Sequence, residues 1–95
     1  MTPDPTDRCT ELMLSAQAGD VEAFEDLHAA LAPVIRSYVA SLAGKLSPAD
    51  HDDLVQETMA AVWHRLGDYR AEASAVTFSL AIAKKLTLKQ HLNSP

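Results

Sequence analysis

The segment from residue 52 to residue 66 constrains the fold more than any other part of the chain, because its apolar residues recur at helical spacing. They fall at i, i+1, i+4, i+5, i+8, i+9 and i+12 and form one broad stripe: Leu54, Val55, Thr58, Met59, Val62, Trp63 and Leu66. Asp53, Gln56 and Glu57 then project from the opposite side, since residues three and four apart share a helix face. The segment therefore predicts a helix that packs into a core through this stripe, Trp63 included, and displays a polar surface outside.

Two helical segments are expected before it. A short helix is predicted from about Asp7 to Ala18, with Gly19 ending it. Asp20 can cap a second helix. The apolar stripe of that helix consists of Phe24, Leu27, Leu31, Val34, Ile35, Tyr38, Val39 and Leu42. Pro33 lies inside this helix and should kink or split it, because proline lacks an N–H donor and clashes with the preceding turn.

The helix that contains residues 52–66 has its own start and stop signals. Ser47-Pro48-Ala49-Asp50 resembles a capping box with proline at the first helical position, and Gly67 should end the helix. After a connector, Ser74 or Thr77 can cap a last helix that runs to about Leu92. No segment predicts a strand, so the expected fold is all-α, a small bundle of about four helices.

The length of 95 residues allows one small domain. Residues 1–7 are expected to form a disordered lead, because they contain prolines and little to bury, and residues 8–95 the helical domain. The lead lacks the basic and apolar regions of a signal peptide, and no apolar run is long enough to cross a membrane. Cys9 is the single cysteine, which fits a reducing compartment. The expected location is the cytoplasm, without membrane contact.

Motifs for catalysis and metal binding are missing from the sequence. The four histidines have no close mutual spacing, and neither His-Glu-x-x-His nor Cys-x-x-Cys occurs. Cys9 has no obvious partner base, so a packed or surface thiol is expected rather than a nucleophile. The three glycines stand singly near helix ends and form no phosphate-binding loop. We therefore expect neither an enzyme nor a bound cofactor or metal.

Charge is divided unevenly along the chain. The first 60 residues hold eleven acidic and three basic residues, and the last 35 hold two acidic and five basic residues. These counts correspond to about −8 and +3, in agreement with the total of −5. Attraction of phosphate depends on local clustering of positive charge, so the acidic total does not exclude nucleic acid. The asymmetry predicts a cationic C-terminal end on an acidic body.

Several short motifs occur in the order and spacing of a known family. They are Ala18-Gly19-Asp20-Val21-Glu22-Ala23-Phe24-Glu25-Asp26-Leu27, Ala32-Pro33, Asp53-Leu54-Val55-Gln56-Glu57-Thr58, Ala61-Val62-Trp63, Tyr69-Arg70, Ala73-Ser74, Thr77-Phe78 and Ile82-Ala83. Through them, residues 12–92 resemble the second conserved region of bacterial extracytoplasmic-function (ECF) sigma factors. The resemblance rests on the series of motifs, since each motif alone is weak.

The resemblance implies a helical bundle that docks on the clamp helices of the largest subunit of core RNA polymerase. It implies that Asp53, Gln56 and Glu57 form the docking surface. It also implies melting and holding of the promoter −10 element, with a non-template base flipped into the connector from Tyr69 to Ser74. The DNA-binding residues implied or inferred on this basis are Tyr69, Arg70, Ser74, Thr77, Phe78, Lys84, Lys85 and Lys89. Such factors have a second domain for the −35 element, and Pro95 stands about where a linker to it would begin. An anti-sigma factor is the expected inhibitor.

The chain departs from the family pattern at its cationic end. Phe78 replaces a customary tryptophan, and a basic residue often found at the position of Ala81 is missing. Phe78 fits a core stripe with Ile82 better than a base-stacking position, and the three lysines fit a solvated face as well as a phosphate-binding one. Two alternatives therefore stay open. One is a sigma-like module that binds an anti-sigma factor, or acts as a decoy, without touching DNA; the other is an unrelated small helical adaptor.

Overall fold

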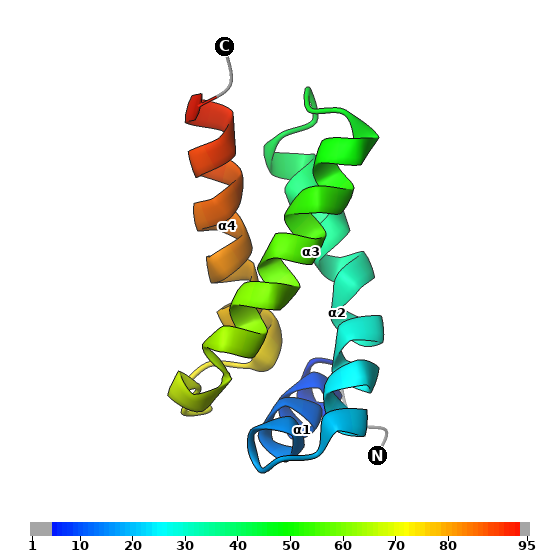
Figure 1. Ribbon diagram of the computed structural model, residues 1–95, viewed down its shortest axis with the longest axis vertical. Coiled ribbons are helices and arrows are strands. Elements are labelled where there is room, and N and C mark those ends of the chain that lie inside the picture. The colour runs from blue at the N-terminus through cyan, green and yellow to red at the C-terminus, as the bar shows by residue number, and fades with distance from the viewer. Residues whose placement is uncertain (1–4, 94–95) are drawn as a thin grey trace.

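Four α-helices and a short 3-10 turn form a bundle in this computed structural model, which describes the backbone of residues 5–93 and the side chains of residues 8–90. The elements are α1 (Pro5–Gln17), α2 (Val21–Leu42), α3 (Pro48–His64), η1 (Leu66–Asp68) and α4 (Ala75–Asn93). In Figure 1, α2, α3 and α4 extend along the long axis, and α1 lies at the end where α2 begins. The helix α1 packs against α2, α4 and η1. Residues 5–93 contain no strand, so the all-α prediction is confirmed.

Local capping signals set most of the helix ends. The Asp20 carboxylate accepts a hydrogen bond from the Ala23 N–H at 3.1 Å and caps α2. At α3 the Asp50 N–H donates to Ser47 Oγ at 3.2 Å and the Ser47 N–H donates to the Asp50 carboxylate at 3.4 Å, which completes the predicted capping box. Gly19 follows α1 with φ of +108°, a conformation that side-chain-bearing residues rarely adopt. These predicted start and stop signals are confirmed.

The core is a single cluster to which all four helices contribute. Its largest fully buried apolar side chains are Met13, Leu27, Leu31, Ile35, Val39, Leu54 and Val62. Each contributes about 1.5–3 kcal/mol relative to an exposed position. On α4 the buried positions spaced four residues apart are small, namely Ala75, Ser79, Ala83 and Thr87. Small side chains leave little between the backbone of α4 and its neighbours, so α4 packs closely.

Several expectations about the helices are wrong in detail. Trp63 is 47% exposed, and Val34 and Leu42 are each 39% exposed, although each was expected in the core. Trp63 occupies the margin of the α3 stripe, where it packs edge-to-face with the Phe24 ring, with 4.6 Å between the ring centroids. A large ring at the margin of a stripe reaches past its neighbour and remains partly in solvent.

Helix boundaries differ from expectation at three places. The helix α1 begins at Pro5 rather than Asp7, and most of the expected disordered lead, residues 1–4, lies outside the described residues. The helix α3 ends at His64, and η1 occupies the last turn that was expected before Gly67. The helix α2 runs unsplit through Pro33. Pro33 is exposed there, so water can hydrogen-bond to the carbonyl four residues earlier that loses its donor.

Candidate functional site

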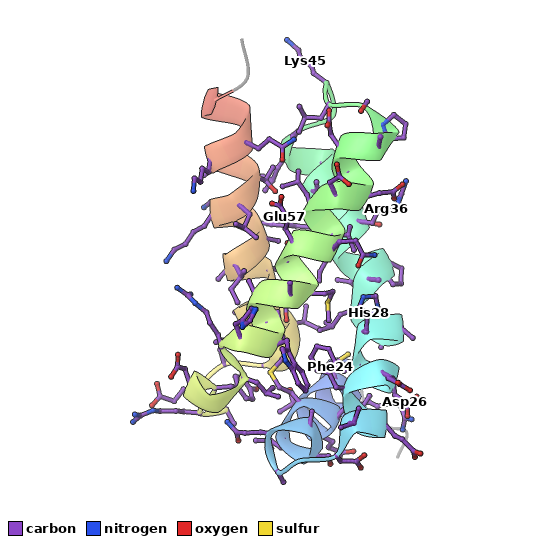
Figure 2. The ribbon with its side chains drawn as sticks, in the orientation of Figure 1. Phe24, Asp26, His28, Arg36, Lys45 and Glu57 are labelled. Carbon is purple, nitrogen blue, oxygen red and sulfur yellow. The ribbon has the colours of Figure 1, made fainter. Side chains whose placement is uncertain are left out.

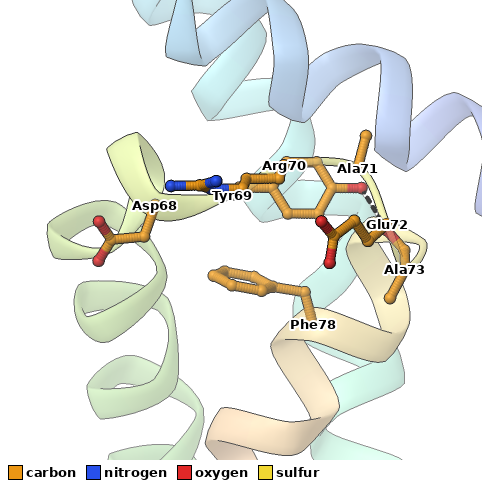
Figure 3. Close-up of a pocket in the computed structure, with 7 residues that line it drawn as sticks. All are labelled: Asp68, Tyr69, Arg70, Ala71, Glu72, Ala73 and Phe78. Atoms are coloured by element: carbon orange, nitrogen blue, oxygen red, sulfur yellow. Dashed lines mark hydrogen bonds between the residues drawn. The ribbon is translucent and has the colours of Figure 1, made fainter.

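A pocket of about 210 Å³ opens in the connector between η1 and α4. Its lining is Asp68, Tyr69, Arg70, Ala71, Glu72, Ala73 and Phe78. Figure 3 shows the rings of Tyr69 and Phe78 next to each other, with the charged groups of Asp68, Arg70 and Glu72 around them. The ring centroids lie 5.1 Å apart in an edge-to-face arrangement. The pocket thus combines an aromatic wall with charges of both signs.

Tyr69 forms part of the frame of this pocket. Its side chain is buried, and its hydroxyl donates a hydrogen bond to the Ala73 carbonyl at 2.6 Å, which closes the connector on itself. Ala71, between them, adopts φ of +59°, a left-handed conformation that is uncommon for a residue with a side chain. Phe78 is half-buried, with part of its ring on the pocket. The expected core position of Phe78 is therefore only partly right, since the ring serves the core and the pocket together.

Ser74 and Thr77 start α4 rather than line the pocket. Ser74 Oγ accepts a hydrogen bond from the Thr77 N–H at 3.1 Å and donates one to Thr77 Oγ1 at 3.0 Å. Of the two capping residues predicted, Ser74 is the one that accepts the backbone donor. Both hydroxyls are engaged with each other in this structure, so their contribution to the site is to fix the direction in which α4 leaves the connector.

A groove lies between α3 and α4, farther along α4 than the connector pocket. Phe78, Ile82, Lys85 and Lys89 follow one another at spacings of four, three and four residues, so they lie along one side of α4. Arg65, at the C-terminal end of α3, faces this stripe across a cavity of about 140 Å³ lined by Ala61, Arg65, Ile82, Lys85 and Leu86. The cavity therefore has an apolar floor and cationic edges.

The cations predicted from the sequence to bind DNA differ from those that border the groove. Lys84, Lys85 and Lys89 are all exposed, but Lys85 lines the groove and Lys84, one residue earlier, points to a different side of α4. Arg65 was not selected, although it is one of only two arginines in the last 35 residues. Its position opposite Lys85 depends on how α3 and α4 pack, which no local pattern reports.

The predicted polymerase-docking residues Asp53, Gln56 and Glu57 are all exposed on α3. Gln56 lies on the flank toward α2, where it lines two neighbouring hollows. Figure 2 shows Glu57 on the opposite flank, toward α4. The three residues thus span the outer width of α3 instead of sharing a narrow edge, and a partner that contacted all three would have to lie across the helix.

The first hollow beside Gln56 is aromatic. It measures about 290 Å³ and is lined by Phe24, His28, Gln56, Met59, Ala60, Trp63 and His64. The second measures about 220 Å³ and is lined by Ala32, Pro33, Arg36, Asp52, Val55 and Gln56. An ion pair between Arg36 and Asp52 crosses it from α2 to α3. Together they make a surface channel along the α2–α3 contact, which we call the α2–α3 groove.

Titratable groups give no sign of a catalytic centre in the described side chains. Burial raises the pKa of the Cys9 thiol, and the charge of neighbouring Arg8 opposes this rise only in part. A thiol with a raised pKa stays protonated and is a poor nucleophile. Among residues 8–90 no three side chains of His, Cys, Asp or Glu gather as metal ligands. No helix within the described part is both long and apolar enough to cross a membrane.

Comparison with known protein families identifies the family to which this helical domain belongs. The chain matches the family model of sigma-70 region 2 over residues 19–93, and because the match covers most of its length, the protein belongs to the sigma-70 region 2 family. Domains of this family generally bind core RNA polymerase and recognise promoter −10 DNA, and they are parts of transcription initiation factors rather than enzymes. Neither a curated protein nor a solved structure matches the chain.

Proposed function

We propose that this protein is an ECF-type sigma region 2 domain that docks on the polymerase clamp helices, melts the −10 element and holds its non-template strand. The observation that supports the DNA role is the arrangement of the connector pocket and of the groove between α3 and α4 along one side of α4. Phe78 borders the pocket, and Ile82 and Lys85, farther along the same side of α4, border the groove. A strand with one base in the pocket can therefore place its next phosphates near Arg65, Lys85 and Lys89. Such a factor acts in the cytoplasm.

The pocket fits a single flipped base. Its aromatic wall offers a surface against which any base can pack. Arg70 stands at the rim, where it can pair with the phosphate of the flipped nucleotide. The groove beyond it supplies positive charge without a hydrogen-bonding pattern directed at base edges. We infer that the pocket selects a base and that the groove adds affinity.

Single-stranded oligonucleotides that differ at one position test the pocket. Fluorescence anisotropy would compare −10-like strands that carry either a natural base or an abasic site at that position. The protein should prefer the best base by about fivefold to a hundredfold, the effect of stacking one base on an aromatic residue. Phe78→Ala should reduce this preference, and Phe78→Tyr should keep it. Equal binding of all the strands by the unaltered protein would refute the DNA role.

Docking on polymerase is proposed through the exposed surface of α3. Asp53 and Glu57 supply negative charge, Gln56 supplies hydrogen bonds, and the α2–α3 groove beside them supplies apolar contact through Trp63. Each exposed charge pair contributes only about 0.2–1 kcal/mol, so affinity must come from the set together with the apolar contact. This combination suits a basic partner with apolar side chains, as proposed for the clamp helices.

A triple substitution tests this docking surface. Asp53→Ala, Gln56→Ala and Glu57→Ala together should weaken binding to core polymerase and leave helicity and thermal stability nearly unchanged, because all three side chains are exposed. Alanine at Glu22, Glu25 and Asp26, which are exposed on α2, is the matched control for loss of acidic charge. Binding of the first triple variant at the affinity of the unaltered protein would exclude the assignment.

A second candidate function is a module that binds an anti-sigma factor without contacting DNA. The small number of cations beside the pocket favours it, since only Arg65 and Lys85 border the cavity between α3 and α4. We also propose an anti-sigma factor for the DNA-binding function, where a small helical protein would cover the Asp53 surface or the α2–α3 groove. Competition binding tests whether the inhibitor covers the docking surface. An inhibitor that binds the domain at the same time as core polymerase would contradict this proposal.

A further inference from the structure

The short helix α1 holds the connector that forms the pocket, although it contributes no residue to the lining. The side-chain amide of Gln17, the last residue of α1, donates hydrogen bonds to the Leu66 carbonyl at 2.9 Å and to the Tyr69 carbonyl at 2.7 Å. Both N–H groups of one amide are thereby directed at the backbone of η1 and the first connector residue. These carbonyls belong to the first residue of η1 and to Tyr69, which follows η1 and lines the pocket.

A second contact from α1 fixes the other end of the connector. Thr10 Oγ1 accepts a hydrogen bond from the N–H of Ala75, the first residue of α4, at 3.0 Å. The first N–H groups of a helix have no partner within the helix, so this bond satisfies one of them from a distant part of the chain. Thr10 and Gln17 lie seven residues apart, which places them on one side of α1.

The connector depends on these contacts because it has few bonds of its own. Between η1 and α4 it contains no regular structure, and Tyr69 Oη to the Ala73 carbonyl is the bond that closes it internally. Ala71 holds an uncommon left-handed conformation between those two residues. A short segment in such a conformation keeps one shape only if its surroundings determine that shape. The helix α1 supplies the surroundings at both ends.

We propose that Gln17 and Thr10 are positioning residues, which hold the connector of residues 69–74 in the shape that accepts a base. The inference rests on the proposed function for its ligand, a flipped nucleobase, but the positioning itself can be measured without DNA. Gln17 is exposed, so its replacement removes hydrogen bonds without opening a hole in the core. Its loss should therefore act on the pocket more than on the stability of the domain.

Gln17→Leu is the first variant to measure. It keeps the size of the side chain and removes both donors, so the preference for a base over an abasic site should fall until the two oligonucleotides bind alike. Binding of the abasic strand should remain, because Arg65, Lys85 and Lys89 are untouched. Val39→Ala serves as the control for lost stability, since Val39 is fully buried near the far end of α2. It should lower the melting temperature and retain the base preference.

Gln17→Glu adds a second measurement, the pH dependence of the base preference, which should stay unchanged if Gln17 only stabilises the domain. A carboxylate cannot donate to the two carbonyls, but a protonated carboxyl group can donate one hydrogen bond. The base preference of this variant should therefore be absent near neutral pH and recover in part as the pH falls toward about 4–5, where a glutamate side chain takes up a proton. Gln17→Leu and the unaltered protein are measured at the same pH values as controls, because they show any change in base preference that does not come from the introduced carboxyl group.

Hydrogen exchange of the backbone amides decides the inference independently of DNA. Gln17→Leu and Thr10→Val should both accelerate exchange in residues 68–75 and leave the amides of α2 and α3 unchanged, whereas Thr10→Ser, which keeps the hydroxyl, should behave as the unaltered protein. Unchanged exchange in residues 68–75 of both variants would overturn the positioning role. Failure of the unaltered protein to distinguish a base from an abasic site would instead overturn the proposed DNA function, with the exchange result still deciding the role of α1.

Discussion

At the scale of single residues, the buried serine and threonine hydroxyls of the described core differ in whether they have a hydrogen-bond partner. Thr58 Oγ1 donates to the Leu54 carbonyl and Thr87 Oγ1 donates to the Ala83 carbonyl, each at 2.7 Å and four residues back along its helix. Ser79 Oγ, also fully buried, has no partner within hydrogen-bonding distance. A buried polar atom without a partner is destabilising, because folding removes its bonds to water and replaces none of them.

Ser79→Ala should therefore stabilise the domain. Removal of the hydroxyl relieves a desolvation cost of about 1–3 kcal/mol and leaves only a small gap, so the free energy of unfolding should rise by about 1 kcal/mol. Urea denaturation followed by circular dichroism measures this change. Thr87→Val is the matched control, because it removes a buried hydroxyl that does have an acceptor and should not increase stability. A loss of stability in Ser79→Ala would show that the hydroxyl has a partner in solution.

Trp63 leads to a second prediction at this scale. It is 47% exposed beside Gln56 in the α2–α3 groove, and tryptophans at interfaces often account for much of the binding energy. Trp63→Ala should weaken core polymerase binding by about tenfold or more. Leu14→Ala, at a residue of similar exposure on α1, should not change it. Undiminished binding of Trp63→Ala in a titration with core polymerase would remove the groove from the docking surface.

Individual residues also show where sequence-based prediction succeeds and where it fails. Asp20 and Ser47 were predicted as caps because a cap acts on backbone groups three residues away. Trp63 was misplaced because periodicity gives the direction of a side chain and not what covers it. Gln17 was missed altogether, since the two carbonyls that it contacts lie 49 and 52 residues farther along the chain. Residue spacing predicts contacts within one helix or turn, and it does not predict the long-range hydrogen bonds of Gln17.

At the scale of elements, α4 places the neighbouring residues Lys84 and Lys85 on different sides of the helix. Lys85 and Lys89 lie with Phe78 and Ile82 along the groove, and Lys84 is rotated by about 100° from Lys85, as one residue of an α-helix requires. A helix of this kind can place adjacent charges in different surroundings even though both are exposed. The sequence predicted the helix and its cations, but the side that is proposed to meet DNA follows from the packing of α4 on α3.

Charge reversal at the two adjacent lysines tests this separation. Lys85→Glu should weaken binding of single-stranded DNA, because it puts a negative charge opposite Arg65 in the proposed path of the backbone. Lys84→Glu makes the same change in net charge on another side of the helix and should weaken binding less. Anisotropy titrations at low and moderate salt compare the two variants. Equal losses would mean that the domain attracts DNA through its overall charge and not through the groove.

At the scale of the whole molecule, the domain is acidic and its proposed DNA surface is cationic. The net charge is −5, and the cations that border the proposed path of the strand are Arg65, Lys85 and Lys89, with Arg70 at the pocket rim. The uneven distribution was visible in the sequence, and the fold gathers these cations on the side of α3 and α4. Repulsion from the acidic body works against every phosphate that approaches, so binding by the domain alone should be weak.

Salt dependence measures how many of these cations meet phosphate. Release of counterions from single strands gives a slope of log K against log salt of about −0.7 per phosphate neutralised, so contacts from all four cations predict a slope of about −3. The dissociation constant of the domain alone should lie in the micromolar range or above, by the same charge argument. Anisotropy over a series of salt concentrations gives the slope. A slope near zero would support the protein-binding alternative.

The clamp from α1 to the connector also has a consequence for the order in which the domain is assembled. The proposed docking surface lies on α2 and α3, which are consecutive in the chain, and so requires mainly local contacts. The pocket requires bonds that join residues separated by 49 to 65 positions. Long-range contacts form later than local ones, because the chain must close a larger loop first. During synthesis the proposed surface for polymerase can thus be complete before the proposed pocket for DNA, which awaits α4, the last of the four helices in the sequence.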